Sequence, residues 1–129
     1  MGNDVLCRIR GPAPAESVAG AVRLALAGHG FVVAAQFDVQ QELLEHVGAH
    51  LAPYVVLFAF NPAATHRVAR CRPAAVATRI FPVVIRYSDD GMIVEVPDVP
   101  GSADPMMTDV LSGPRHRLSK ALNELSVGA

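Results

Sequence analysis

The stretch from Tyr54 to Pro62, YVVLFAFNP, passes directly from seven apolar residues into an Asn-Pro pair. A continuous apolar run of this length is typical of a strand, and we expect both of its faces to be covered. Asn61 is a strong helix N-cap, and Pro62 is suited to the first helical position. The stretch therefore predicts an interior strand that leads directly into a helix.

Two strand-helix units precede this stretch. Alternating apolar residues predict a first strand over 5–9, and apolar residues at helical spacing predict a helix over 14–28. The Gly-His-Gly sequence at 28–30 supplies the left-handed stop that helix ends favour. A second alternating segment predicts a strand over 31–38.

The helix after this second strand has a clear apolar side. The carboxylate of Asp38 can cap its free amides, while the side chain of Gln41, three residues on, can reach back to the cap. Pro53 ends the segment. At helical spacing five residues share one side, which we expect to pack on the core: Val39, Leu43, Leu44, Val47 and Leu51.

The helix after Asn61 is short, because Arg72-Pro73 ends it. Its apolar side contains Ala64, Val68 and Cys71, which places His66 toward water. We expect Cys71 and Cys7 to be free buried thiols rather than a disulfide.

A hairpin is predicted over 78–96, with Asp90-Gly91 as its turn signal. Pro82 cannot donate a ladder hydrogen bond, so it indicates a bulge or an edge position. A last helix is expected after Pro114. The order β-α-β-α-β-α-β-β-α predicts one α/β domain of the α+β type over residues 1–129: a two-layer sandwich with a five-stranded, mixed but mainly antiparallel sheet covered by helices.

The composition bounds the partners. Apolar residues make up 51% and charged residues 18% of the chain, which excludes a largely disordered protein. A formal charge of −1 gives no electrostatic reason to expect nucleic acid or a membrane surface as a partner. No signal peptide and no apolar run of about 20 residues is present, so we expect a cytoplasmic protein.

The order of several short motifs resembles the domain-of-unknown-function (DUF) family 302. The motifs are the "GF" pair after the first helix, a strand ending in Asp38, the segment "VGAHLAPY", then "NP", "FPVVIRY", "DDG" and a late "DPMM". The resemblance spans residues 5–125 and implies a compact α/β domain, often a homodimer, with no established activity. Members of the family often carry cysteines where this chain has Phe60 and Val83, so a redox or metal role through those thiols is not expected here.

Glu42, His46 and His50 are spaced four apart, which would align them along the predicted helix. Two histidines at this spacing can chelate a divalent metal, whereas the simpler interpretation is a polar helix edge. Each step climbs about 6 Å, so one ion cannot reach both ends of the row. The sequence therefore predicts no metal site and no cofactor.

Three functional hypotheses remain, and the sequence favours binding over catalysis. The first is a small-molecule binding or sensing module, with a pocket near Tyr54 between the second helix and the sheet. The second is an enzyme whose acid-base residues come from His46, His50 and Glu42. The third is a domain that serves dimerisation or interaction only. The candidate ligand contacts are Tyr54, Asn61, His46 and His50.

Overall fold

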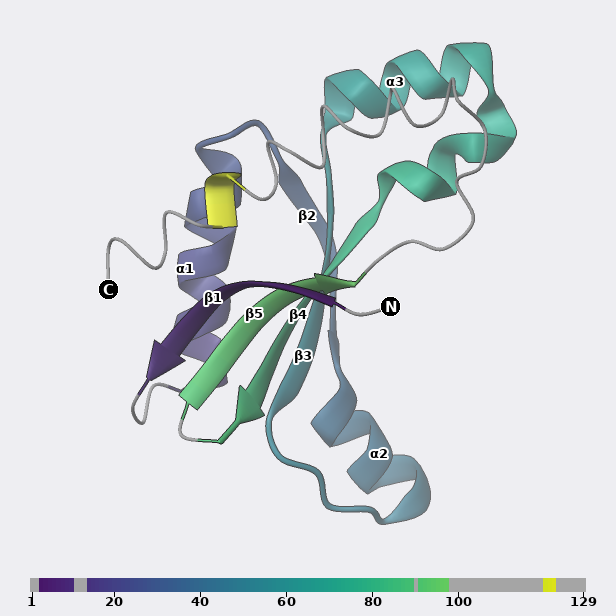
Figure 1. Ribbon diagram of the computed structural model, residues 1–129. Coiled ribbons are helices and arrows are strands. Elements are labelled where there is room, and N and C mark those ends of the chain that lie inside the picture. Colours follow the sequence, from purple (N-terminus) through teal and green to yellow (C-terminus); the bar gives the residue numbers. More distant parts are fainter. Residues whose placement is uncertain (1–2, 11–13, 90, 98–119, 123–129) are drawn as a thin grey trace.

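The computed structural model describes residues 3–10, 14–89, 91–97 and 120–122 (Figure 1). In this described part five strands form one sheet in the order β1-β5-β4-β3-β2. The strands are β1 (Asn3–Arg10), β2 (Val32–Asp38), β3 (Tyr54–Phe60), β4 (Phe81–Ser88) and β5 (Gly91–Pro97).

Every strand pair in the described sheet is antiparallel. The predicted α/β class is confirmed, but the predicted mixed sheet is wrong. The helix between β2 and β3 returns the chain beside the strand that it has just left, and β1 lies at the opposite edge of the sheet from β2. No two parallel strands therefore become neighbours in the described sheet.

Three α-helices and one 3-10 helix connect the described strands. They are α1 (Ala15–Ala27), α2 (Val39–Val47), α3 (Pro62–Cys71) and η1 (Pro73–Arg79). Figure 1 shows α1 lying along one face of the sheet, with α2 and α3 at opposite ends of β3. Lys120–Leu122 are also helical, and the rest of the last helix predicted after Pro114 lies outside the described residues.

The hydrophobic core lies between α1 and the sheet. Val22 and Leu26 of α1 are fully buried, as the helical spacing of its apolar residues predicts. The helix ends before Gly28, but the left-handed residue is Gly30, with φ of 84°. The strand side chains of this core are Val55, Leu57, Ala59, Phe81, Val83, Ile85, Met92, Val94 and Val96.

The opposite face of β3 is only partly covered, so the prediction of a strand covered on both faces is wrong. Burial alternates along β3: Val55, Leu57 and Ala59 are buried, whereas the residues between them are half-buried. On this face Phe37 of β2 pairs with Val56, and Val32 pairs with Phe60. Both β2 residues are exposed. We call this surface of β2 and β3 the open face; its residues are Val32, Ala35, Phe37, Tyr54, Val56, Phe58 and Phe60.

The apolar side of α2 is exposed, and the prediction that it packs on the core is wrong. None of the α2 residues is buried, and Val47 is 69% exposed. The helix begins on the residue after β2 ends, and Gly48, with φ of 65°, ends it after nine residues. No connecting residues are left to fold α2 back over the sheet, so it projects beyond the end of the sheet (Figure 1).

Both predicted helix caps are confirmed. Asp38 Oδ1 accepts a hydrogen bond of 3.0 Å from the Gln41 amide, and Asn61 Oδ1 accepts one of 3.0 Å from the Ala64 amide. The predicted return contact of the Gln41 side chain is wrong, because its Nε2 donates instead to Glu45 Oε1 at 2.8 Å. Each cap satisfies an amide that the helix itself cannot pair.

Pro82 occupies a local edge of β4. It pairs with Phe58 of β3, whereas the described pairing of β4 with β5 begins at Val84, so within the described sheet Pro82 has a neighbour on one side only. Cys71 is a free but exposed thiol, so its predicted burial is wrong. It is the last residue of α3, where the helix no longer has a covered side. The side chain of Cys7 lies outside the described residues.

Candidate functional site

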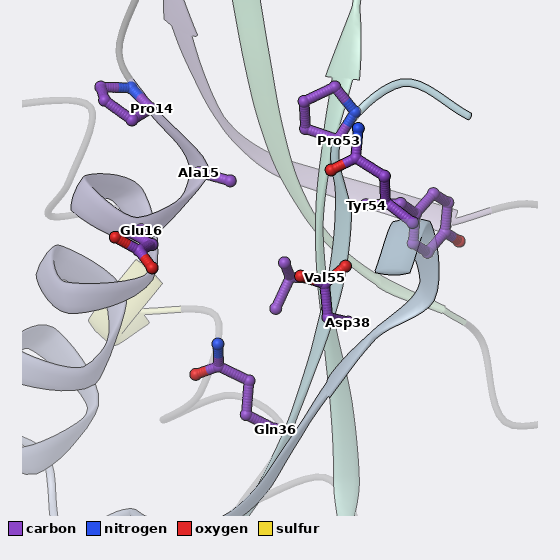
Figure 2. A pocket seen from close by; sticks show the side chains of 9 residues that line it. Pro14, Ala15, Glu16, Gln36, Asp38, Pro53, Tyr54 and Val55 are labelled. Atoms are coloured by element: carbon purple, nitrogen blue, oxygen red, sulfur yellow. The ribbon is translucent and has the colours of Figure 1, made fainter. Parts of the chain in front are cut away.

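A hollow of about 410 Å³ lies between the N-terminal end of α1 and the adjacent ends of β2 and β3 (Figure 2). Glu16 contributes from α1, Gln36 and Asp38 from β2, and Val55 from β3. In the strand register Asp38 pairs with Val55 and Gln36 with Leu57, which places both polar residues on the face that α1 covers. Polar residues of β2 therefore line the hollow beneath the start of α1.

Hydrogen bonds hold several of the polar groups around the hollow. Arg23 Nη2 donates to Gln36 Oε1 at 2.7 Å, and Gln40 Nε2 donates to the Leu51 carbonyl at 2.8 Å. Asp38 uses Oδ1 to cap α2. In the described part of the chain no basic side chain forms an ion pair with Glu16.

The chemistry of the hollow is acidic and hydrogen-bond accepting. Carboxylate oxygens of Glu16 and Asp38 line it, together with side-chain amides and an apolar wall that includes Val55. Such a lining complements a small molecule with a protonated amine or several hydrogen-bond donors. Among the described lining residues no nucleophile lies beside a histidine or lysine, the pairing that would indicate covalent catalysis.

The four candidate ligand contacts from the sequence lie in separate places. Tyr54 lines the hollow, but the predicted pocket lay between the second helix and the sheet, whereas this hollow lies against the start of α1. The ring of Tyr54 points away from Glu16 (Figure 2). Asn61 is at the other end of β3, where it is 8% exposed and caps α3. His46 and His50 are exposed and do not line the hollow.

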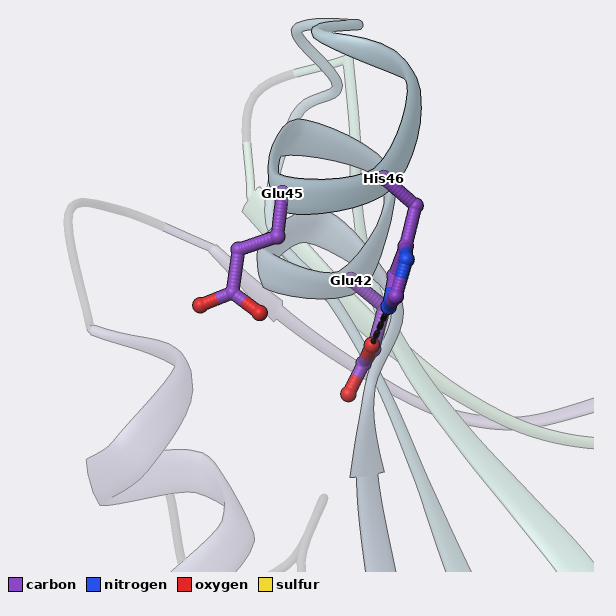
Figure 3. A group of neighbouring side chains, drawn as sticks. All are labelled: Glu42, Glu45 and His46. Atoms are coloured by element: carbon purple, nitrogen blue, oxygen red, sulfur yellow. Dashed lines mark ion pairs between the residues drawn. The ribbon is translucent and has the colours of Figure 1, made fainter.

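Figure 3 shows Glu42 and His46 of the predicted row together with Glu45, and His46 Nε2 lies 3.0 Å from Glu42 Oε2. One ligand atom from each of Glu42, Glu45 and His46 falls within 4.8 Å of the others. His50 does not extend the row, because α2 ends at Val47 and the chain turns at Gly48. The remaining pair is an exposed i,i+4 contact of the kind that contributes about 0.2–0.5 kcal/mol to a helix.

A buried ion pair lies on the face of the sheet opposite α1, and the sequence analysis missed it. Glu95 of β5 is 1% exposed, and its Oε1 accepts a hydrogen bond of 2.6 Å from Arg86 Nε of β4. This bond raises the pKa of the Arg86 guanidinium. Arg86 also pairs with Tyr54 in the strand register, so the three polar side chains cross three neighbouring strands. A glutamate between two valines in the predicted hairpin was the signal that could have revealed the pair.

A second arginine is buried where η1 meets β4. Arg79 is 1% exposed, and its Nη1 donates to Thr78 Oγ1 at 3.4 Å. Burial lowers the pKa of this guanidinium. Arg79 does not line the hollow.

Comparisons with known proteins identify a family and a solved structure with the same fold. Residues 9–125 match the family model described as "Domain of unknown function DUF302". The crystal structure of an uncharacterized conserved protein DUF302 from Bacillus stearothermophilus superimposes with a TM-score of 0.78 at 20% sequence identity. That likeness covers 90% of this chain and 94% of the other, and it shows the shared fold. No curated protein matches the chain.

The described helices were also compared with the length of a membrane span. None of them is both long and apolar enough to cross a bilayer.

Proposed function

Since the chain belongs to the DUF302 family, whose function is unknown, we propose its role from its own surfaces: it is a binding module that works as a homodimer through the open face and α2. One observation carries this proposal. In the described part of the chain nine large hydrophobic residues are exposed, and six of them lie between residues 32 and 51. They are Val32, Phe37, Leu43, Leu44, Val47 and Leu51.

The size of this surface supports association. A large aromatic side chain such as that of Phe37 carries about 150–250 Å², and leucine and valine side chains carry less. The six side chains, exposed to between 37% and 69%, therefore present several hundred Å². A stable interface buries about 800 Å² per partner. The half-buried side chains of β3, among them Phe58 and Phe60, lie beside β2 and can supply the remainder.

The geometry supports binding over catalysis. The enzyme hypothesis assembles Glu42, His46 and His50, but the end of α2 separates His50 from the other two. His46 is 73% exposed at its side chain, so water rather than a shaped cavity surrounds its ring.

A matched pair of variants tests the homodimer. Val47 of α2 and Leu24 of α1 are 69% and 78% exposed, and each lies in the last turn or so of its helix. Val47→Asp places a charge in the proposed interface, whereas Leu24→Asp places it on α1. Light scattering after gel filtration should give twice 13.6 kDa for the native chain and for Leu24→Asp. Val47→Asp should dissociate at the same concentration. A native chain with the monomer mass of 13.6 kDa contradicts the proposal, and so does equal dimerisation of both variants.

A second candidate function is the binding of a small cationic molecule in the hollow, and the presence of both Glu16 and Asp38 in its lining favours it. Tyr54 is the predicted ligand contact that lines this site. Glu16→Gln combined with Asp38→Asn removes both charges, while asparagine retains the ability to cap α2.

Calorimetry with an aliphatic diamine and with a neutral polyol of similar length measures this function. The diamine should bind the native chain, and the double variant should lose that binding. Glu42→Gln removes one carboxylate outside the hollow and serves as the control. Failure of both probes to bind, or unchanged diamine binding by the double variant, contradicts the candidate function.

A further inference from the structure

The charges of the chain separate along β3. The helix α2 carries Glu42 and Glu45 and contains no lysine or arginine. The sequence has no aspartate or glutamate between Glu45 and Asp89, so α3 and η1 carry only basic charges. Arg67 and Arg70 of α3 are exposed. The chain is nearly neutral as a whole, yet in its described part the helix at one end of β3, α2, carries acidic charges, and the helix at the other end, α3, carries basic ones.

The topology fixes these charges at opposite ends of the open face. The chain enters β3 from α2 and leaves it into α3, and β3 has seven residues. A strand of that length spans about 23 Å. This separation is more than twice the distance over which salt screens exposed charges, about 8 Å at physiological ionic strength. Within one copy the acidic and basic helices therefore do not neutralise each other.

The two-fold axis that joins two open faces lies between them, and its two limiting orientations are parallel and perpendicular to β3. If the axis runs parallel to β3, α2 meets α2 and α3 meets α3, so like charges face each other at both ends. If the axis runs perpendicular to β3, α2 of each copy meets α3 of the other. Like-charge contacts across an interface disfavour binding, and opposite charges fix its register.

We propose that the second copy docks with its β3 antiparallel, so that acidic α2 of one copy packs against basic α3 of its partner at both ends of the interface. This inference rests on the proposed homodimer and adds its axis and its polar contacts. The exposed apolar residues of β2 and α2 then lie inside the interface, and Glu42, Glu45, Arg67 and Arg70 lie at its rim. The two sheets pack face to face, which places them about 10 Å apart.

Paired charge reversals test the axis. One variant, Glu42→Lys with Glu45→Lys, makes both helices basic; the other, Arg67→Glu with Arg70→Glu, makes both helices acidic. In the proposed dimer each variant repels itself at both ends. A mixture of the two variants attracts at both ends, because every acidic helix meets a basic one.

Sedimentation velocity of each variant and of the mixture measures the result. Each variant alone should dimerise at least about tenfold more weakly than the native chain, and the mixture should form a heterodimer close to native affinity. Lys120→Glu, a reversal beside Ala121 and Leu122 on the α1 side of the sheet, should dimerise like the native chain. Circular dichroism checks that every variant is folded.

The outcomes separate this inference from the homodimer itself. A native chain that stays monomeric overturns both. A native dimer with unchanged association of both reversal variants overturns the axis and leaves the homodimer in place. Two weakened variants that fail to associate when mixed also overturn the axis, because the perpendicular arrangement requires the mixture to recover.

Discussion

Helices α1 and α2 both have an apolar side, yet only α1 buries it. Val22 and Leu26 of α1 are fully buried, whereas Leu44 and Val47 of α2 are 42% and 69% exposed. The difference lies in where each helix starts. The helix α1 lies along the sheet, while α2 begins on the residue after β2 and projects beyond it (Figure 1). An apolar helical side thus identifies a surface to be covered, and the topology decides whether the same chain covers it.

The largest expected effect is in α1, whose apolar side is buried. Leu26→Ala removes a fully buried side chain from the core beneath α1 and should lower the free energy of unfolding by about 2–5 kcal/mol. Leu44→Ala removes the same atoms from exposed α2 and should cost less than about 1 kcal/mol in the monomer. Urea unfolding at a concentration that keeps the chain monomeric measures both values. Equal losses would mean that α2 is packed within a single chain.

A smaller effect is expected on the face of the sheet opposite α1, where β5 buries the charge of Glu95. Arg86→Met leaves the carboxylate of Glu95 buried without the partner that now donates to it at 2.6 Å. The expected loss of stability is about 2 kcal/mol at neutral pH, below the value for a fully buried pair because Arg86 is 34% exposed.

The pH dependence of that variant has a definite sign. An unpaired buried carboxyl favours its protonated form, so the loss should be small at acidic pH and should grow as the pH rises. In the native chain the raised pKa of Arg86 keeps the guanidinium charged across this range. Urea unfolding of both chains from acidic to neutral pH tests the sign. A loss that is constant with pH would show that packing of the arginine, rather than its charge, supports Glu95.

The smallest expected effects are at the two helix caps. Asn61 and Asp38 accept amide hydrogen bonds of equal length, 3.0 Å, but Asn61 is 8% exposed and Asp38 is exposed. Asn61→Ala should cost about 1–2 kcal/mol and Asp38→Ala about 0.5–1 kcal/mol, because water can replace only the exposed cap. Thermal unfolding of the two alanine variants gives this order. Asn61→Asp, which retains a capping oxygen, should remain within about 1 kcal/mol of the native chain. A larger loss for Asp38→Ala would break the relation between burial and cap strength.

Local signals in the sequence predicted the local features of the fold. Asp38 and Asn61 act as caps because the chemistry of a helix start involves only a few neighbouring residues. The α/β class also followed from the order of apolar periodicities. What covers each apolar surface could not be predicted in the same way, because periodicity shows which side of an element is apolar and not what lies against it. The faces of β3 and α2 are the examples.

The same distinction between local and tertiary features applies to the candidate site. A hollow beside Tyr54 could be predicted, but the prediction placed it against the second helix, whereas it lies beneath the start of α1. The contribution of Glu16 could not be predicted, because the tertiary fold rather than the local sequence brings the start of α1 beside the end of β2. To predict the ion pair of Arg86 and Glu95, one would need the register of the hairpin, which brings the two residues together on neighbouring strands.

Sedimentation equilibrium of the native chain over a range of micromolar concentrations tests most directly whether a second copy covers the open face and α2. The mass should rise with concentration toward twice 13.6 kDa and fall back on dilution, as a reversible two-fold association requires. A mass of 13.6 kDa that does not change over the whole range would contradict the account, because the exposed residues between Val32 and Leu51 would then have no partner from a second copy.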